Sequence, residues 1–364
     1  MKITAAIVRK KSGPFIIEEI ELDEPRDNEV LVKIVSAGVC HTDLVCRDQY
    51  YPVPLPAVFG HEGAGIVEKV GKQVTKVKPG DHVVLSYFTC GDCISCKKGR
   101  IGYCFNLYVC NFSGARLDGS TTMKKGGEVI HGSFFNQSSF ATYALATERN
   151  VVKVSKEAPL EKLGPLGCGI QSGAGSVMNA LHPKPGSSIA IFGMGSVGLS
   201  GILGAVICGC TKIIGVDINS TRLKLARELG ATHTFNSKET DPVKAIQELT
   251  FTGADYSLDC TGLPQVFRQA VDSLTLTGIC GLVGAAPLGT EVCLDMNSIF
   301  FGRTVRGIIE GDSIPDIFIP QMIELYNQGR FPFDRLITFY SLDEINKAAE
   351  DSEKGCVLKP VLYF

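Results

Sequence analysis

Residues 187–217 read SSIAIFGMGSVGLSGILGAVICGCTKIIGVD, and this stretch decides the fold of the second half of the chain. An apolar strand leads into a glycine-rich turn with the spacing Gly193-x-Gly195-x-x-Gly198, and an apolar helix follows. A second strand then ends at Asp217, 19 residues after the last glycine. Such glycines let the backbone approach a pyrophosphate at a helix N-terminus. The stretch therefore predicts a dinucleotide-binding unit.

The alternation of strand and helix continues beyond this unit. Further strands are expected at 233–235, 256–259, 278–283 and 305–308, with helices at 221–229, 243–250 and 265–274 between them. Strands that alternate with helices in this way are typical of a doubly wound parallel sheet. We therefore expect an α/β domain over residues 170–309.

Asp217 bears on the choice of cofactor. Its carboxylate can accept hydrogen bonds from the adenosine ribose hydroxyls and would repel a 2′-phosphate, which favours NAD over NADP. Arg222 complicates this prediction, because it could serve the ribose of NAD or weaken the discrimination against NADP.

The first half of the chain has a different pattern. Residues 1–35 alternate apolar and polar side chains, which predicts antiparallel strands, and more strand is expected up to residue 86. Residues 105–139, rich in Gly, Asn and Ser, are expected to form a long irregular segment. We expect a β-rich domain over 1–169, to which the C-terminal segment 310–364 returns.

Residues 36–65 place Cys40 and His61 about twenty positions apart, each at an apparent strand end. A thiolate and an imidazole are two of the three protein ligands that a catalytic zinc needs, and Cys168, on a turn, is the candidate for the third. A cysteine and a histidine this far apart are by themselves more often unrelated. Possible outer-shell partners stand beside them: Thr42, Asp43 and Glu62.

Four cysteines form a compact cluster with the spacing C-x2-C-x2-C-x7-C: Cys90, Cys93, Cys96 and Cys104. Thiols this close do not easily form unstrained disulfides with one another, but they can wrap one tetrahedral zinc with no open position. An iron–sulfur cluster is a competitor whose common spacings differ from this one. The cluster predicts a structural zinc.

Composition excludes several function classes. The chain of 364 residues has a formal net charge of −2, which gives no electrostatic case for a nucleic-acid partner. No apolar run reaches the ~18 residues of a membrane span, and the N-terminal apolar run is too short for a signal peptide. We therefore expect a cytoplasmic protein without a membrane partner.

The combined motifs carry a resemblance over essentially the whole chain. GHEGAGIVEKVG at 60–71, the four-cysteine cluster and the GMGSVG loop have the order and spacing of the zinc-dependent medium-chain alcohol dehydrogenases. Within that family, CHTDLVCRDQYYPVPLPAVFGHEG at 40–63 and GPLGCGIQSGAGSVMNAL at 164–181 are most similar to the aryl-alcohol (benzyl alcohol) dehydrogenases.

The resemblance implies a GroES-like catalytic domain, a Rossmann domain and a cleft between them. It implies two zinc ions per chain: a catalytic ion held by Cys40, His61 and Cys168 with its fourth position open, and a structural ion on the four-cysteine cluster. The activity implied is the reversible, NAD-dependent oxidation of a primary alcohol to the aldehyde by hydride transfer. The family also forms dimers and tetramers through the cofactor domain, so we expect a homodimer or homotetramer.

The resemblance also implies roles for single residues. Asp43 orients the ligand histidine, Glu62 enters and leaves the metal coordination, Thr42 contacts the substrate oxygen and takes its proton, and Lys359 contacts the cofactor phosphates. The side chains expected to face the substrate are Tyr51, Val109, Phe134, Phe135 and Ala285.

Two positions depart from the family pattern. Val45 stands where animal members carry the histidine that ends the proton relay, so the relay would end in water. His41 stands where they carry a phosphate-binding arginine, and it can still hydrogen-bond a phosphate with less charge near pH 7.

Four other functions remain open. A zinc-free quinone or enone reductase of the same fold typically lacks the Cys40, His61 and Cys168 set. A glutathione-dependent formaldehyde dehydrogenase needs basic pocket residues, of which the sequence shows no convincing set, and another aliphatic or allylic alcohol dehydrogenase also fits. A non-catalytic NAD-sensing protein is disfavoured because both predicted zinc sets are retained.

Overall fold

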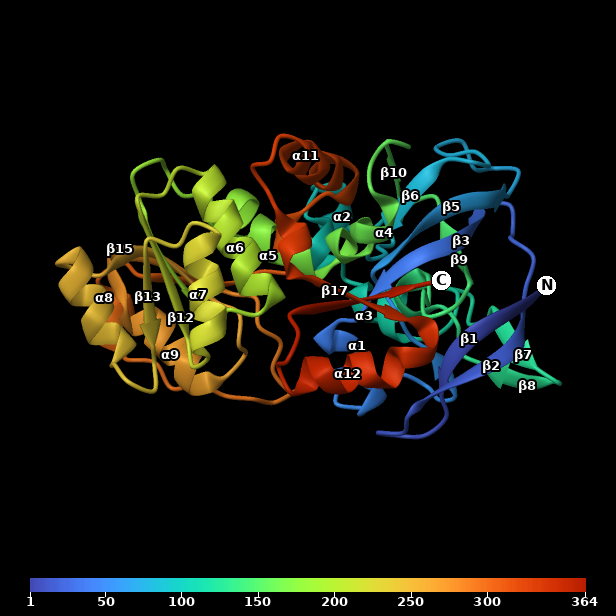
Figure 1. The fold of residues 1–364 in the computed structure, drawn as a ribbon, viewed down its shortest axis with the longest axis horizontal. Helices are drawn as coiled ribbons and strands as arrows, with labels where there is room; N and C mark the ends of the chain where they lie inside the picture. The colour runs from blue at the N-terminus through green and yellow to red at the C-terminus, as the bar shows by residue number, and fades with distance from the viewer. The chain divides into compact units, whose positions relative to one another are not determined.

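A computed structural model describes all residues, 1–364, and the chain divides into two compact units (Figure 1). Unit 1 comprises Met1–Cys168, Ile314–Glu324 and Asp334–Phe364. Unit 2 comprises Gly169–Ser313 and Leu325–Phe333. None of the helices combines the length with the apolar character that crossing a membrane requires.

Unit 1 is built on two sheets. The five-stranded sheet has the order β4-β1-β2-β7-β8, and the seven-stranded sheet has the order β10-β6-β5-β3-β18-β17, with β9 also paired to β3. The strand bounds are β1 Lys2–Val8, β2 Phe15–Leu22, β3 Glu29–Gly38, β4 Ala57–Val58, β5 Gly63–Val70, β6 His82–Leu85, β7 Met123–Lys125, β8 Glu128–Ile130, β9 Tyr143–Thr147, β10 Val151–Val154, β17 Ile337–Ser341 and β18 Lys359–Tyr363. Most pairings are antiparallel, as the alternating sequence predicts.

The helices of unit 1 are short and connect the strands. They are α1 His41–Arg47, α2 Ile94–Lys97, α3 Leu107–Phe112, α4 Leu160–Leu163 and α12 Ile345–Glu353, while α11, Pro315–Asn327, begins in unit 1 and ends in unit 2. The prediction of a long irregular segment at 105–139 is wrong in part. It contains α3 and the β7–β8 hairpin, whose short strands alternate too briefly to give a periodic signal.

The C-terminal segment enters the seven-stranded sheet. β18 pairs antiparallel with β3, with Val361 opposite Gly38, and it pairs in parallel with β17. In Figure 1 the red end of the chain accordingly lies beside the blue β3. This pairing brings Lys359, 320 positions further along the chain, next to Val39 at the end of β3.

Unit 2 contains one six-stranded sheet with the order β13-β12-β11-β14-β15-β16, and every pairing is parallel. The strands are β11 Ser188–Phe192, β12 Lys212–Asp217, β13 His233–Asn236, β14 Ala254–Asp259, β15 Leu274–Leu282 and β16 Thr304–Gly307. The helices are α5 Gly169–Gly175, α6 Ser196–Ile207, α7 Ser220–Glu228, α8 Pro242–Thr250, α9 Pro264–Asp272 and α10 Met296–Phe300. The predicted doubly wound parallel sheet is confirmed.

The strand order of this sheet places its ligand-binding edge. If the six strands are numbered 1 to 6 as they follow in the chain, their order across the sheet is 3-2-1-4-5-6. The direction of winding therefore reverses between β11 and β14. β11 is almost entirely buried and apolar, which suits a central strand covered on both faces. The glycine turn follows β11 directly, at the carboxyl edge where open parallel sheets bind their ligands.

Candidate active site

Two cysteines, a histidine and a glutamate of unit 1 meet at one point. The ligand atoms of Cys40, His61, Glu62 and Cys168 all lie within 4.8 Å of one another. Cys40 is the residue before α1, His61 and Glu62 directly precede β5, and Cys168 follows a short 3-10 turn at Gly164–Gly167. The fold therefore assembles the predicted ligand set from three distant segments.

Asp43 fixes the ring of His61. Its Oδ1 lies 2.9 Å from Nδ1 of His61, and both side chains are completely buried. The same carboxylate accepts the backbone N–H groups of Cys40 and Gly60, at 2.9 and 3.0 Å. A carboxylate accepts only, so we assign the ring proton to Nδ1 and the free lone pair to Nε2.

The other ring nitrogen of His61 shows that the cluster fits a metal. Nε2 is buried and has no hydrogen-bond partner within the protein, a state that is costly unless a ligand satisfies it. It belongs to the same 4.8 Å group as the sulfur atoms of Cys40 and Cys168. Two thiolates and one imidazole are the donor set of a catalytic zinc that retains an open position.

The charges around the cluster favour the metal-binding form of Cys40. The hydrogen bond from Cys168 and the positive charge of Lys359 hold the pKa of the Cys40 thiol well below its usual value, despite burial. The thiolate is the form of cysteine that binds metals. Cys40 Sγ also lies 3.9 Å from the hydroxyl oxygen of Thr42 on α1.

Lys359 and Glu62 form a buried ion pair at the cluster. The Lys359 ammonium lies 3.0 Å from both carboxylate oxygens of Glu62 and 3.4 Å from the carbonyl oxygen of Val39. Burial alone would lower the pKa of Lys359, but the charges of Glu62 and Cys40 raise it above its usual value. That Lys359 contacts the cofactor phosphates stays a prediction; its contacts here are with Glu62 and Val39.

The predicted four-cysteine cluster is also assembled. The sulfur atoms of Cys90, Cys93, Cys96 and Cys104 lie within 4.8 Å of one another, and none of the four is in a disulfide. Hydrogen bonds from the backbone around Asp92 and Cys93 outweigh burial and lower the pKa of Cys90 to about 6. Four sulfur donors at this separation fit a tetrahedral metal without an open position.

In unit 2 the glycine turn has the conformation that a dinucleotide site needs. Gly193 has φ +90°, which favours glycine, and a Cβ on Gly198 would lie 1.9 Å from the Gly193 carbonyl oxygen. Gly195 is the residue before α6, so the turn delivers the N-terminus of that helix.

Asp217 has a second role that the sequence did not indicate. Its carboxylate accepts the backbone N–H of Met194, at 2.6 Å, and that of Asn219, at 2.8 Å. Asp217 therefore braces the glycine turn in addition to the ribose contact predicted for it. Arg222 lies on α7, where its backbone N–H donates to the side chain of Asn219, the residue that caps the helix.

Two of the predicted substrate-facing side chains, Phe135 and Tyr51, belong to a network of ring contacts. Phe135 stacks on the His61 ring, with centroids 4.5 Å apart and planes 29° apart, and Tyr51 makes an edge contact with Phe112. Phe112 also contacts Phe134 and Phe135. It was not among the residues predicted from the sequence, where its only signal is the aromatic pair that it forms with Tyr108, four positions earlier on α3.

The other predicted substrate-facing side chains differ in their exposure. Phe134 has no exposed surface and packs against Phe59 and His61, and its contact with a substrate stays a prediction. Val109 is exposed on α3. Ala285 is exposed and belongs to unit 2, and His41 is exposed at the start of α1.

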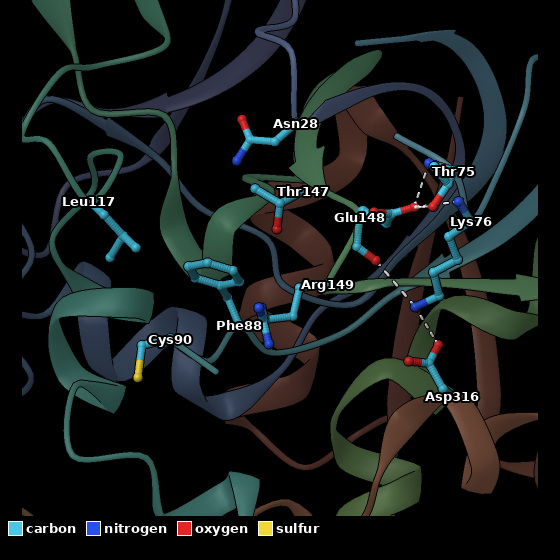
Figure 2. Close-up of a pocket in the computed structure, with 10 residues that line it drawn as sticks. All are labelled: Asn28, Thr75, Lys76, Phe88, Cys90, Leu117, Thr147, Glu148, Arg149 and Asp316. Carbon is cyan, nitrogen blue, oxygen red and sulfur yellow. Dashed lines mark hydrogen bonds and ion pairs between the residues drawn. The ribbon is translucent and has the colours of Figure 1, made fainter. Parts of the chain in front are cut away.

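A separate cavity of about 610 Å³ lies beside the four-cysteine cluster (Figure 2). Cys90 and Arg149 line it, but none of the residues predicted for catalysis does. Lys76 pairs with Asp316 at 2.5 Å, and Glu148 accepts hydrogen bonds from the backbone and hydroxyl of Thr75, so most of its charges have partners. The cavity therefore belongs to the surroundings of the structural cluster.

Comparisons with known proteins agree with this geometry. Residues 26–156 match the alcohol dehydrogenase GroES-like domain, and residues 196–328 match the zinc-binding dehydrogenase family. The chain is 48% identical over 363 residues to geraniol dehydrogenase of Castellaniella defragrans, covering 99% of this chain and 97% of that protein.

Two solved structures are similar over the whole chain. One is an alcohol dehydrogenase zinc-binding domain protein from Burkholderia ambifaria, with a TM-score of 0.99 at 56% identity. The other is benzyl alcohol dehydrogenase from Acinetobacter calcoaceticus, with a TM-score of 0.97 at 50% identity. Both matches cover 100% of this chain and 99% of the other.

Proposed function

The chain belongs to the zinc-dependent alcohol dehydrogenases, and we propose that it oxidises an unsaturated primary alcohol to the aldehyde with NAD. The observation that carries this proposal is the buried, unpartnered Nε2 of His61 within 4.8 Å of two cysteine sulfurs. We further propose two zinc ions per chain, the catalytic one on Cys40, His61 and Cys168.

The residues of the chain divide the chemistry among them. When bound, zinc stabilises negative charge on the alcohol oxygen and NAD accepts a hydride. Thr42, whose hydroxyl lies beside Cys40, holds the alcohol proton and passes it on. Asp43 orients His61, and the Glu62–Lys359 pair sets the charge next to the ligands.

We propose a flat alcohol whose hydroxyl-bearing carbon adjoins an unsaturated carbon, and among these an aromatic, benzyl-type alcohol. Tyr51, Phe112 and Phe135 form a connected aromatic group that contacts His61 through Phe135, and aromatic contacts add about 0.5–1.5 kcal/mol per pair. The two named relatives support the broader class, because geraniol and benzyl alcohol share this unsaturated carbon.

Matched alcohols test the substrate proposal. We expect kcat/KM for benzyl alcohol to exceed that for cyclohexylmethanol by about 5- to 150-fold, because two aromatic contacts are together worth about 1–3 kcal/mol. Geraniol against citronellol, which lacks the allylic double bond, gives the same comparison for allylic alcohols. Equal kcat/KM values within both pairs would exclude unsaturated alcohols as the preferred substrate class. A preference in the geraniol pair alone would assign the chain to allylic alcohols.

The variant Asp217→Gly tests the proposed preference for NAD over NADP. A hydrogen bond to a charged group contributes about 1.5–3 kcal/mol, so we expect NAD to bind roughly 10–100-fold more weakly and the NADP/NAD ratio of kcat/KM to rise. Asp217→Asn is the matched control, because it keeps an acceptor for the Met194 N–H but removes the charge that repels a 2′-phosphate. An unchanged ratio in both variants would assign the choice to another residue, such as Arg222.

We also propose a homodimer or homotetramer formed through unit 2. Its edge strand β16 has no partner on one side within the chain, and large apolar side chains nearby are exposed, Met296 by 85% and Phe300 by 81%. Unpaired strand edges beside apolar patches are typical of contact surfaces between copies. For the domains, we propose that 1–169 is catalytic, that 170–309 binds the cofactor and that 310–364 returns to the catalytic domain.

A further inference from the structure

The loop 133–139 of unit 1 is held in an unusual backbone conformation next to the metal ligands. Phe135, Asn136 and Ser138 have φ values of +50°, +52° and +50°, although none of them is glycine. Left-handed backbone at such residues is unfavourable and persists only where the surroundings enforce it. All seven residues of the loop are buried.

Backbone hydrogen bonds fasten this loop to the segment that leads to His61. Ser139 N–H donates to the Gly60 carbonyl at 2.9 Å, and Phe140 N–H donates to the Phe59 carbonyl at 3.0 Å. The hydroxyl of Ser138 donates to the Val58 carbonyl at 2.6 Å. The conformation of the loop is thus set by the segment 58–60.

The side chain of Gln137 reaches from this loop to both sides of Glu62. Its Nε2 donates to the His61 carbonyl at 3.0 Å and to the Ser86 carbonyl at 3.3 Å. Its Oε1 accepts the Gly63 N–H at 3.1 Å. One amide therefore holds the backbone before and after Glu62, and Gln137 has no exposed surface.

The same loop also holds the ring of His61. Phe135, two residues before Gln137, stacks on the imidazole, while Asp43 fixes Nδ1 from another direction. Asp43 and Phe135 thus set the orientation of the ring, and Gln137 sets the position of the backbone that carries it.

We propose that Gln137 is a positioning residue of the catalytic metal site. Its amide holds the His61 carbonyl and the Gly63 N–H, and so keeps His61 and Glu62 at the separation from Cys40 and Cys168 that a metal requires. Supporting groups behind metal ligands typically change metal affinity by about 10–100-fold when they are removed. The inference rests on the proposed function, because it assumes that these residues bind a metal.

The test must separate positioning from the general cost of losing a buried amide. Gln137→Met removes the amide at similar side-chain length, and Gln137→Asn keeps an amide that is shorter by one methylene group. The matched control is Asn111→Leu, since Asn111 is also completely buried and its amide also clasps backbone, that of Phe88 and Leu107.

The measurements are the release rate of zinc into a chromogenic chelator and the visible spectrum of the cobalt-substituted protein. The metal of the catalytic site is assigned by its loss in Cys40→Ala. We expect Gln137→Met to release this metal about 10–100-fold faster than wild type and to shift the cobalt bands. Gln137→Asn should give a release rate and a cobalt spectrum between those of Gln137→Met and wild type. It also provides the result if Gln137→Met does not fold.

Asn111→Leu should lower the melting temperature comparably and leave the catalytic metal signals unchanged. If both Gln137 variants melt earlier but keep the wild-type release rate and cobalt spectrum, the positioning role is refuted and Gln137 only packs. A wild-type protein that holds no metal through Cys40 would instead overturn the proposed function, and this inference with it.

Discussion

Cys40→Ala is expected to lower kcat/KM for alcohol oxidation by about 10³-fold or more and to leave one zinc ion per chain. A metal contributes several kcal/mol to the stabilisation of charge on the reacting oxygen, and each 1.36 kcal/mol is a factor of about ten in rate. Removing Cys40 leaves His61 and Cys168 as the only ligands apart from Glu62, whose carboxylate is paired with Lys359. Metal analysis and steady-state kinetics check this expectation.

Cys93→Ala is the matched control in the other cluster. It should remove the structural zinc and lower the melting temperature by roughly 5–10 °C, because metal binding contributes to folding. Its remaining folded fraction should keep the zinc on Cys40, His61 and Cys168 and turn over substrate. If Cys40→Ala retained both zinc ions, or turned over at the wild-type rate, the assignment of the catalytic ligands would be wrong.

Thr42→Ala is expected to lower kcat by about 10²–10⁴-fold, the usual contribution of a positioned proton-transfer group. The hydroxyl of Thr42 lies beside Cys40 Sγ, and alanine can neither accept nor donate a proton. Thr42→Ser keeps the hydroxyl and should retain most of the activity. Single-turnover hydride transfer measured across pH checks both variants; equal rates in Thr42→Ala and wild type would exclude Thr42 from the proton path.

Val45 is the position at which to test how the proposed proton path ends. Valine has no proton to exchange, so we expect small amine bases to change wild-type hydride transfer and Val45→His to change its pH profile with little loss of rate. If the wild type is insensitive to added base and Val45→His leaves the pH profile unchanged, the relay does not end in water at this position.

The fold was predictable where the sequence is locally periodic. The turn from Gly193 to Gly198 has a strand before it, and Asp217 ends the next strand. This pattern predicts the parallel sheet, because each strand, turn and helix in it is recognised from residues that are neighbours in the sequence. The segment 105–139 was predicted less well, because its strands β7 and β8 are each three residues long and β7 is stabilised by pairing with distant β2.

The side chains that meet at the site were predictable from residue type, but their supporting contacts were not. Cys40, His61 and Cys168 carry chemistry that a sequence displays. That Lys359 pairs with Glu62 depends on β18 entering the sheet beside β3, and that Gln137 holds His61 depends on a loop in left-handed backbone. Both are long-range consequences of packing, which local patterns do not encode.

The central claim is that the chain transfers a hydride from an alcohol to NAD at the site of Cys40, His61 and Cys168. The most direct test incubates wild type and Cys40→Ala with NAD and benzyl alcohol or geraniol in which both hydrogens of the hydroxyl-bearing carbon are deuterium, and measures the mass and the rate of formation of the reduced cofactor by mass spectrometry. We expect NADH that is heavier by one deuterium with wild type, formed at least about 10³-fold more slowly with Cys40→Ala. Unlabelled NADH, no NADH with wild type, or labelled NADH formed at equal rates by both proteins would contradict this claim.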